Sequence, residues 1–133
     1  MKQLKGVKVP HRKNTTHDKP VRMPIPAVVR IPMAMHIGAP CKPVVAVGDE
    51  VKVGQLIGEP AGFVGAPIHA SVSGKVTAID KVQLFNGSFP AVVIESDGLQ
   101  TVCEDVKPPQ ITDVKSFLDA VRASGLVGLG GAG

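Results

Sequence analysis

Glycine and proline punctuate this chain so closely that long helices are disfavoured over most of its length. Fifteen glycines and twelve prolines occur among its 133 residues, and they separate short runs rich in valine and isoleucine. β-Branched residues lose rotamer freedom in helices and pack well on a pleated surface. Such runs, bounded by turn-forming residues, are typical of short strands joined by turns. We therefore expect a mainly β protein of one domain's size.

The segment between residues 27 and 102 carries the strand pattern. Apolar residues alternate with polar ones on both sides of expected turns at Gly48-Asp49, Gly54 and Ser73-Gly74, and Asn86-Gly87 is a hairpin signal. Residues 33–43 are expected to be irregular because prolines and a glycine interrupt them. We predict roughly seven or eight strands in a β-sandwich or flattened barrel. The runs that carry the pattern are 27–31, 44–47, 51–53, 55–57, 68–72, 76–79, 81–85 and 89–96.

A single segment, ITDVKSFLDAVRASG at residues 111–125, has helical periodicity. Its apolar residues are spaced i, i+3, i+4 and i+7, which places them on one helix face. They are Val114, Phe117, Leu118 and Val121. Thr112 or Asp113 can cap the start of this helix, and Gly125 can end it. We expect a connecting helix between the β module and whatever follows.

Positive charge is concentrated near the N-terminus. Residues 1–30 hold eight of the fifteen lysines and arginines against the single acid Asp18, so this part carries +7 and the remainder −3. A basic arm can contact nucleic acid, anionic lipid or an acidic partner. The arm holds no aromatic residue for base stacking, so we do not expect a nucleic-acid partner. We predict instead a solvated arm that drapes over the domain.

No catalytic or metal-binding constellation is expected. Cys41 and Cys103 form no CxxC motif, which indicates neither a zinc nor an iron–sulfur site and fits a reduced compartment. His36 and His69 lack a third ligand in the sequence pattern, so structural hydrogen bonding is expected for both. Cys41 is expected to be an inert, half-buried thiol, although Lys42 beside it could activate it. The neighbouring acids at residues 49 and 50 point opposite ways on a strand and cannot form a catalytic pair.

A glycine-rich string, GLGGAG, occupies residues 128–133. Glycines let backbone N–H groups approach a ligand, usually a phosphate, and a following segment often completes the cradle. We expect this chain to be the front part of a longer polypeptide in which a nucleotide site begins here. Because short glycine motifs are weak signals, a disordered glycine tail is the alternative.

Two strings resemble biotinyl- and lipoyl-carrier domains. These are GDEVKVGQLIG, at residues 48–58, and APIHASVSGKVTAI, at residues 66–79. The resemblance implies a barrel-sandwich hybrid, a flattened β-barrel built of two similar halves. Carrier domains attach their cofactor to a lysine at a hairpin tip, whereas the corresponding loop here, PAGFVGAP at residues 60–67, contains no lysine. We therefore expect no covalent biotin or lipoate, and Lys52 and Lys75 are expected to be ordinary exposed residues.

A longer resemblance extends from about residue 28 to residue 133. HIGAPCKPVVAVGDEVKVGQLIGE, GFVGAPIHASVSGKVTAI and the helix leading into GLVGLGGAG are similar to the N-terminal region of the C subunit of Rnf-type ion-translocating electron transport complexes. The arm departs from that family's GGIHPP-like start, because it reads KGVKVP at residues 5–10.

The resemblance implies a role as well as a fold. It implies a scaffolding domain without catalysis of its own, in a subunit that lies peripherally on the cytoplasmic face of a membrane complex. That complex passes electrons between ferredoxin and NAD, with other subunits as partners. FMN or NADH and [4Fe–4S] clusters are implied for the full-length protein and none for this part. The resemblance assigns part of the flavin and NAD loop to Gly128, Gly130, Gly131, Ala132 and Gly133.

The expected organisation has four parts. They are a basic arm at 1–26, a barrel-sandwich hybrid domain at 27–108, a connecting helix at 109–125 and the glycine-rich start of a flavin or NAD domain at 126–133. A carrier domain is one alternative. The other is the related A subunit of a Na⁺-translocating NADH:quinone reductase.

Overall fold

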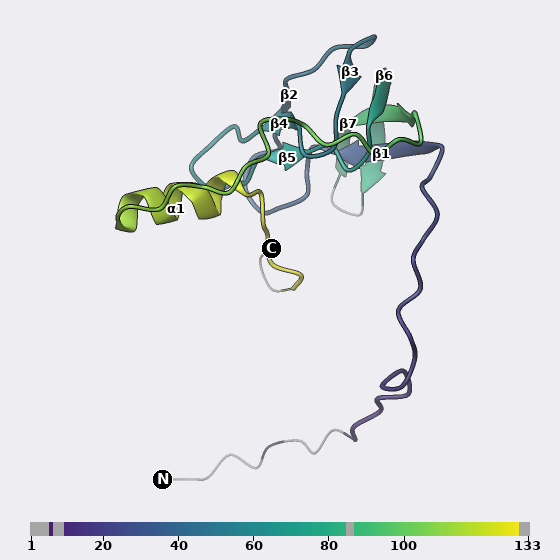
Figure 1. The fold of residues 1–133 in the computed structure, drawn as a ribbon, viewed down its shortest axis with the longest axis vertical. Helices are drawn as coiled ribbons and strands as arrows, with labels where there is room; N and C mark the ends of the chain where they lie inside the picture. The colour runs from purple at the N-terminus through teal and green to yellow at the C-terminus, as the bar shows by residue number, and fades with distance from the viewer. Residues whose placement is uncertain (1–5, 7–9, 85–86, 131–133) are drawn as a thin grey trace.

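The structure, a computed structural model, describes residues 6, 10–84 and 87–130 (Figure 1). Its described part is mainly β, with a single helix near the C-terminus. The strands are β1 (Val28–Pro32), β2 (Lys42–Pro43), β3 (Glu50–Val51), β4 (Leu56–Glu59), β5 (Ile68–His69), β6 (Gly74–Leu84) and β7 (Gly87–Ser96), and the helix is α1 (Val114–Ala123). This architecture confirms the predicted barrel-sandwich hybrid with one C-terminal helix.

Two antiparallel sheets enclose the core. One sheet has the strand order β1-β7-β6-β3 and the other has the order β2-β4-β5. The core between them consists of aliphatic and sulfur-containing side chains: the chain has no tryptophan or tyrosine, and no phenylalanine of the described residues belongs to the core. Its five largest fully buried apolar members are Met33, Ile57, Val76, Val92 and Ile94. Removing this apolar surface from water is the main term that stabilises the fold.

The β6–β7 hairpin is longer than the sequence predicts. The two short strands expected at 76–79 and 81–85 are one continuous strand, β6, which is eleven residues long. No glycine or proline interrupts it after Gly74, and Asp80 stays in the ladder opposite Ala91. The hairpin turn expected at Asn86-Gly87 lies partly outside the described residues. Neither the expected break at residue 80 nor a strand at 44–47 forms, and residues 44–47 are a connection instead.

Gly74 has a different role from the one expected. It begins β6 with a φ of +150° rather than forming a turn with Ser73, and a Cβ at this position would collide with the backbone carbonyl of Glu95. Glycine is therefore required by a close approach of two strands. The turn prediction at residues 73–74 is wrong for this reason.

A buried serine ties the end of β7 to the following loop. The Ser73 side chain is 1% exposed, and its hydroxyl donates to Oδ1 of Asp97 over 2.7 Å. The hydroxyl oxygen of Ser73 also accepts the backbone N–H of Thr101 over 2.9 Å. The hydrogen bond from Ser73, followed by that from the Leu99 backbone, holds the pKa of Asp97 below its usual value. The Ser73 hydroxyl therefore organises the chain from residue 97 to residue 101.

The basic arm does not drape over the domain. Residues 10–25 are all exposed, and the arm extends away from the body of the molecule (Figure 1). A turn at residues 13–18, closed by the Asp18 N–H on the Thr15 carbonyl over 3.1 Å, is its only hydrogen-bonded feature among the described residues. The expectation that the arm drapes over the domain is therefore wrong, whereas its predicted exposure to solvent is confirmed.

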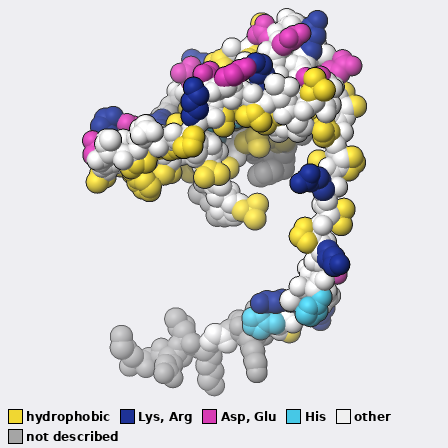
Figure 2. Space-filling model, viewed as in Figure 1, with side chains coloured by type: hydrophobic (Ala, Val, Ile, Leu, Met, Phe, Trp, Pro, Cys, Tyr) yellow, Lys and Arg dark blue, Asp and Glu magenta, His cyan; other side chains and the backbone are white. Residues whose placement is uncertain are grey.

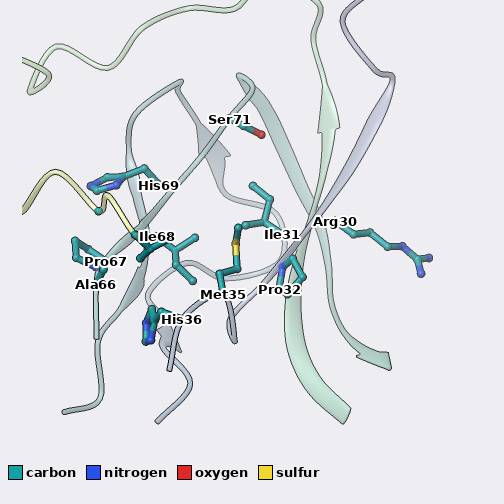
Figure 3. Close-up of a pocket in the computed structure, with 12 residues that line it drawn as sticks. Arg30, Ile31, Pro32, Met35, His36, Ala66, Pro67, Ile68, His69 and Ser71 are labelled. Atoms are coloured by element: carbon teal, nitrogen blue, oxygen red, sulfur yellow. The ribbon is translucent and has the colours of Figure 1, made fainter. Parts of the chain in front are cut away.

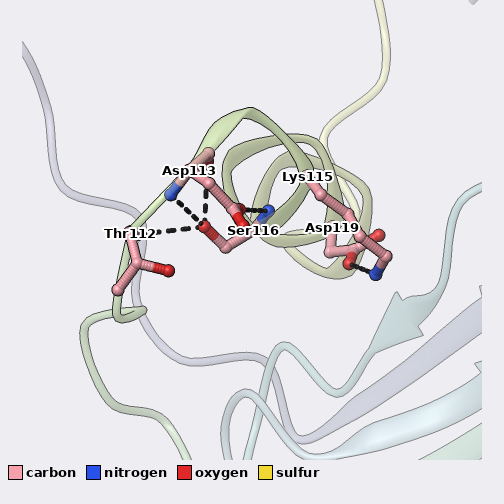
Figure 4. Close-up of polar contacts among 5 residues, drawn as sticks. All are labelled: Thr112, Asp113, Lys115, Ser116 and Asp119. Atoms are coloured by element: carbon pink, nitrogen blue, oxygen red, sulfur yellow. Dashed lines mark hydrogen bonds and ion pairs between the residues drawn. The ribbon is translucent and has the colours of Figure 1, made fainter.

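The predicted helix is confirmed, including its N-cap. Asp113 is the capping residue: its carboxylate accepts the Ser116 N–H over 2.7 Å. The Ser116 hydroxyl in turn accepts the N–H groups of Thr112 and Asp113, each over 3.0 Å (Figure 4). This reciprocal pair is a capping box. Gly125, with a φ of +70°, follows the last turn as expected.

Candidate functional site

The described part of the glycine-rich string forms no cradle. Gly128 is exposed in an irregular segment, and a Cβ on Gly130 would meet no atom within 4 Å. Gly131, Ala132 and Gly133 lie outside the described residues. The assignment of these five residues to a cofactor loop therefore stays a prediction.

The loop at residues 60–67, called the tip loop from here on, connects β4 to β5 and meets the C-terminal end of α1. Nη2 of Arg122 donates to the Gly62 carbonyl over 3.2 Å, and its guanidinium carbon lies 5.7 Å from the centroid of the Phe63 ring. That distance is within the range of a cation–π interaction. A Cβ on Gly125 would lie 2.5 Å from the Pro67 carbonyl oxygen. The last turn of α1 is therefore seated on the tip loop.

The rest of α1 presents its apolar side to solvent. None of its residues is buried, and Phe117 and Leu118 are 53% and 59% exposed. An amphipathic helix of a globular protein normally turns this stripe toward a core. Apolar side chains gather along the lower edge of the helix in the space-filling view (Figure 2). The helix thus carries an apolar stripe that the described residues leave uncovered.

Further apolar side chains are exposed on the tip loop and on the residues after α1. Phe63 is 89% exposed, Leu126 is 81% exposed and Leu129 is fully exposed. Large exposed apolar patches on a protein are typical of interaction surfaces. We call this surface the docking face. It consists of Phe63, Val114, Phe117, Leu118, Val121, Leu126 and Leu129.

A mostly apolar pocket of about 360 Å³ lies beside the core and contains both predicted histidines in its wall. His36, Ile68 and His69 surround it, whereas the Arg30 side chain extends away from the other lining residues (Figure 3). Nδ1 of His36 is 2.7 Å from the Ile37 carbonyl oxygen, so structural hydrogen bonding is confirmed for this ring. His69 instead lies beside Gly125.

Cys41 is more deeply buried than the sequence predicts. Its side chain is 3% exposed rather than half-buried, and its thiol donates to the Ala66 carbonyl over 3.2 Å. Nε2 of His36 lies 3.4 Å from the sulfur. Burial raises the pKa of the Cys41 thiol, which disfavours the reactive thiolate. This environment supports the expectation of an inert cysteine over activation by Lys42, and that expectation stays a prediction.

The two lysines considered for cofactor attachment lie outside the tip loop. Lys52 follows β3 and is ion-paired with Glu104, and that hydrogen bond raises the pKa of Lys52 and lowers that of Glu104. Lys75 is an exposed residue of β6, opposite Glu50 and Glu95 in the ladder. Lys52 is therefore ion-paired and only partly exposed, whereas an ordinary exposed residue was expected. Lys75 is exposed, as expected.

Two kinds of feature are missing from the described residues. No group of three or more histidine, cysteine or acidic residues is placed to hold a metal ion in the part of the chain that the structure describes. Within the same residues, no helix has the length and apolar character needed to cross a membrane.

Sequence reasoning found the apolar stripe of α1 but not its exposure. Periodicity predicts which side chains share a face, whereas what covers that face depends on tertiary packing. The contact between Arg122 and Phe63 joins residues far apart in sequence, and no local signal indicates it.

Comparison with known proteins identifies the family. A family model described as the RnfC barrel sandwich hybrid domain matches residues 1–99. The chain is 46% identical over 132 residues to the C subunit of the Na(+)-translocating ferredoxin:NAD(+) oxidoreductase complex of Acetobacterium woodii, covering 96% of this chain and 30% of that protein.

Two further relatives agree with this match. The C subunit of the proton-translocating ferredoxin:NAD(+) oxidoreductase complex of Clostridium ljungdahlii is 45% identical, over 96% of this chain and 29% of its own length. The C subunit of the ion-translocating oxidoreductase complex of Pseudomonas aeruginosa is 38% identical, over 96% of this chain and 17% of its own length. The chain thus spans less than a third of the length of these relatives.

Proposed function

The chain belongs to the RnfC barrel sandwich hybrid domain family, and on that premise we propose that it is the N-terminal docking domain of the C subunit in an ion-translocating ferredoxin:NAD oxidoreductase complex. In this role the β module is a rigid support without catalysis of its own. It holds the remainder of the subunit against neighbouring subunits, peripherally on the cytoplasmic face of the membrane.

The docking face is the single observation that carries this proposal. The β module buries its own core fully, yet α1 leaves its apolar stripe exposed and is fixed to the module through Arg122 and Gly62. When a partner covers the apolar stripe of such a helix, the complex is stabilised by about 25 cal/mol per Å² of apolar area buried. An assembly role therefore explains a feature that a free-standing domain would not need.

The redox groups belong, in this proposal, to other parts of the full-length subunit. Among the described residues no metal-ligand cluster gathers, and no atom lies within 4 Å of a Cβ placed on Gly130. Residues 128–133 are proposed to begin the flavin or NADH loop, whose remaining residues follow in sequence. The tip loop offers no lysine for biotin or lipoate.

A pair of matched substitutions tests the docking face. Phe117→Gln combined with Leu118→Gln makes the exposed stripe polar, while Lys115→Gln changes the opposite, charged side of α1, where Lys115 pairs with Asp119 over 2.6 Å. Glutamine is a good helix former, so all these variants keep α1. Losing the burial of two such side chains weakens binding by about 1–2 kcal/mol each, or roughly thirty- to a thousandfold for the two.

The measurement is the affinity of the full-length subunit for a complex that lacks it. The stripe variant should bind at least tenfold more weakly, whereas Lys115→Gln should bind as the unmodified subunit does. Equal affinities for the two variants, with circular dichroism showing intact helix, would contradict the proposed role of the docking face.

A further inference from the structure

Apolar and other residues alternate strictly from the arm into β1. Between residues 21 and 33 every odd position is apolar, and the even positions hold four prolines, two arginines and one valine when residue 20 is included. The odd residues are Val21, Met23, Ile25, Ala27, Val29, Ile31 and Met33, and the even residues are Pro20, Arg22, Pro24, Pro26, Val28, Arg30 and Pro32. A period of two over this length is the signature of an extended strand with one apolar face.

In and around β1, odd-numbered and even-numbered residues point their backbone groups in opposite directions. The Ala27 carbonyl accepts the Ser96 N–H over 2.8 Å, and the Met33 N–H donates to the Pro90 carbonyl over 2.8 Å. In an antiparallel pair, alternate residues exchange both hydrogen bonds with the same neighbour. The odd residues of β1 therefore pair with β7, and the even residues turn their N–H and C=O groups outward. Pro26 and Pro32 lack N–H groups and flank that outward edge, which protects it against pairing with another strand.

In the arm, the backbone groups of the odd-numbered residues have no neighbouring strand to pair with. β7 ends at Ser96, opposite Ala27, where the chain bends, so the residues before Ala27 leave the sheet and have no strand beside them (Figure 1). Val21, Met23 and Ile25 supply an N–H and a C=O each along one edge of the extended arm, and among the described residues these groups have no backbone partner. On the opposite edge Arg22 is the one residue between Pro20 and Pro26 with an N–H group. The arm is thus a strand that can pair on one side only.

The side chains of the same odd-numbered residues are also exposed. Val21, Met23 and Ile25 are 92%, 74% and 45% exposed. Three apolar side chains at two-residue spacing fit pockets on the face of a partner sheet, the arrangement used in strand addition.

Charge identifies the kind of partner. The described arm carries Arg12, Lys13, Lys19 and Arg22 against Asp18, so a second copy of the arm would bring like charges together. A lipid surface can neutralise this charge, but it offers no strand edge to pair with the open backbone N–H and C=O groups. An acidic strand of another protein satisfies both the backbone and the charge.

We propose that residues 20–26 form a one-sided strand that pairs, through the backbone of Val21, Met23 and Ile25, with an exposed acidic strand of a different protein chain. The inference rests on the proposed function only for the source of that chain, which is then a neighbouring subunit of the complex.

Two proline substitutions, one on each edge of the arm, test the proposal. Met23→Pro removes an N–H from the open edge, and Met23→Ala is its control for the lost side chain. Arg22→Pro removes an N–H from the blocked edge, and Arg22→Ala is its control for the lost charge. Both sites are exposed and precede the sheet, so urea unfolding should report an unchanged β module in each variant.

The measurement is retention of the full-length subunit by the assembled complex. Met23→Pro should bind at least tenfold more weakly than Met23→Ala, and Arg22→Pro should equal Arg22→Ala. Equal proline effects at the two positions, or none at either, would overturn the inference. If the unmodified subunit is not retained at all, the proposed function fails instead, which keeps the two failures distinct.

Two other partners for the open edge, a second copy of the chain and a membrane, would give different results with the isolated chain. A dimer in sedimentation that Met23→Pro dissociates would assign the edge to a second copy. Binding to vesicles containing phosphatidylserine that is lost in Arg22→Ala but kept in Met23→Pro would assign the arm to a membrane. Either result would overturn the proposed partner.

Discussion

Replacing Ser73 by alanine removes the hydroxyl that organises the chain after β7. That hydroxyl is buried, donates to Asp97 and accepts the backbone N–H of Thr101. The Ser73→Ala change deletes one oxygen and leaves the sheet, the core and the backbone conformation of residue 73 unchanged. The loop at residues 97–101 then loses its central hydrogen-bonding partner.

The expected loss follows from the two hydrogen bonds. A typical intramolecular hydrogen bond contributes about 0.5–1.5 kcal/mol net, so losing both bonds of the buried Ser73 hydroxyl is expected to cost about 1–3 kcal/mol. The Thr101 N–H has no other acceptor in the hydrogen bonds of the described residues, but Thr101 is exposed and water can hydrogen-bond to it. A loss of this size lowers Tm by roughly 4–8 °C for each kcal/mol in a domain of 60–100 residues.

Urea unfolding of the isolated chain, followed by circular dichroism, measures this change. Ser71→Ala is the matched control, because Ser71 is an exposed serine two residues earlier in the same segment. We expect the midpoint to fall by about 1 M for Ser73→Ala with an unchanged slope, and to stay constant for Ser71→Ala. Equal midpoints in the two variants would refute the assignment of Ser73 as the tie between β7 and the loop.

Further predictions address the same network, the core and the helix. Because hydrogen bonding lowers the folded-state pKa of Asp97 below its unfolded value, the native carboxylate contributes stability above about pH 4 that is lost as pH falls through the lowered pKa. Ser73→Ala should therefore lose less stability than the unmodified chain in unfolding curves recorded between about pH 4 and pH 2; parallel curves would speak against it. Ile94→Ala empties a fully buried site and should cost about 2–5 kcal/mol in urea unfolding, and a loss below about 1 kcal/mol would mean the core is not as described. Asp113→Ala removes the N-cap and should lower the helical signal in circular dichroism, with a loss of about 0.5–2 kcal/mol in helix stability; an unchanged spectrum would contradict the capping role. Gly125→Ala places a Cβ 2.5 Å from the Pro67 carbonyl oxygen, so proteolysis within α1 should become faster, and an unchanged rate would show that the helix end is not seated on the tip loop.

Local chemistry in the sequence predicts a large share of this fold. Glycine and proline punctuation with valine-rich runs indicates a mainly β module, and the spacing of Val114, Phe117, Leu118 and Val121 predicts α1. These signals succeed because strand and helix periods are properties of neighbouring residues.

The misses arise where distant parts of the chain decide the outcome. Gly74 is expected to form a turn, but the nearby carbonyl of Glu95 requires the glycine there. Cys41 is buried rather than half-buried because Ala66, from the tip loop, covers it. Neither neighbour can be read from adjacent positions.

The arm differs from the rest of the chain because it has no partner in the sheet. In sequence, the alternation of Val21, Met23 and Ile25 continues into β1. Only a window that crosses the expected domain boundary at residue 26 contains the whole alternation. The candidate site is likewise predicted only in part, since the helix face is visible in the sequence and its exposure is not.

In the proposed function, a surface of this chain does the work and the cofactor sites lie elsewhere in the full-length subunit. Calorimetric titration of the isolated chain with FMN and then with NADH tests that division. We expect heats equal to those of dilution for both ligands. A saturable binding heat with one equivalent of either ligand and a Kd in the micromolar range would contradict it.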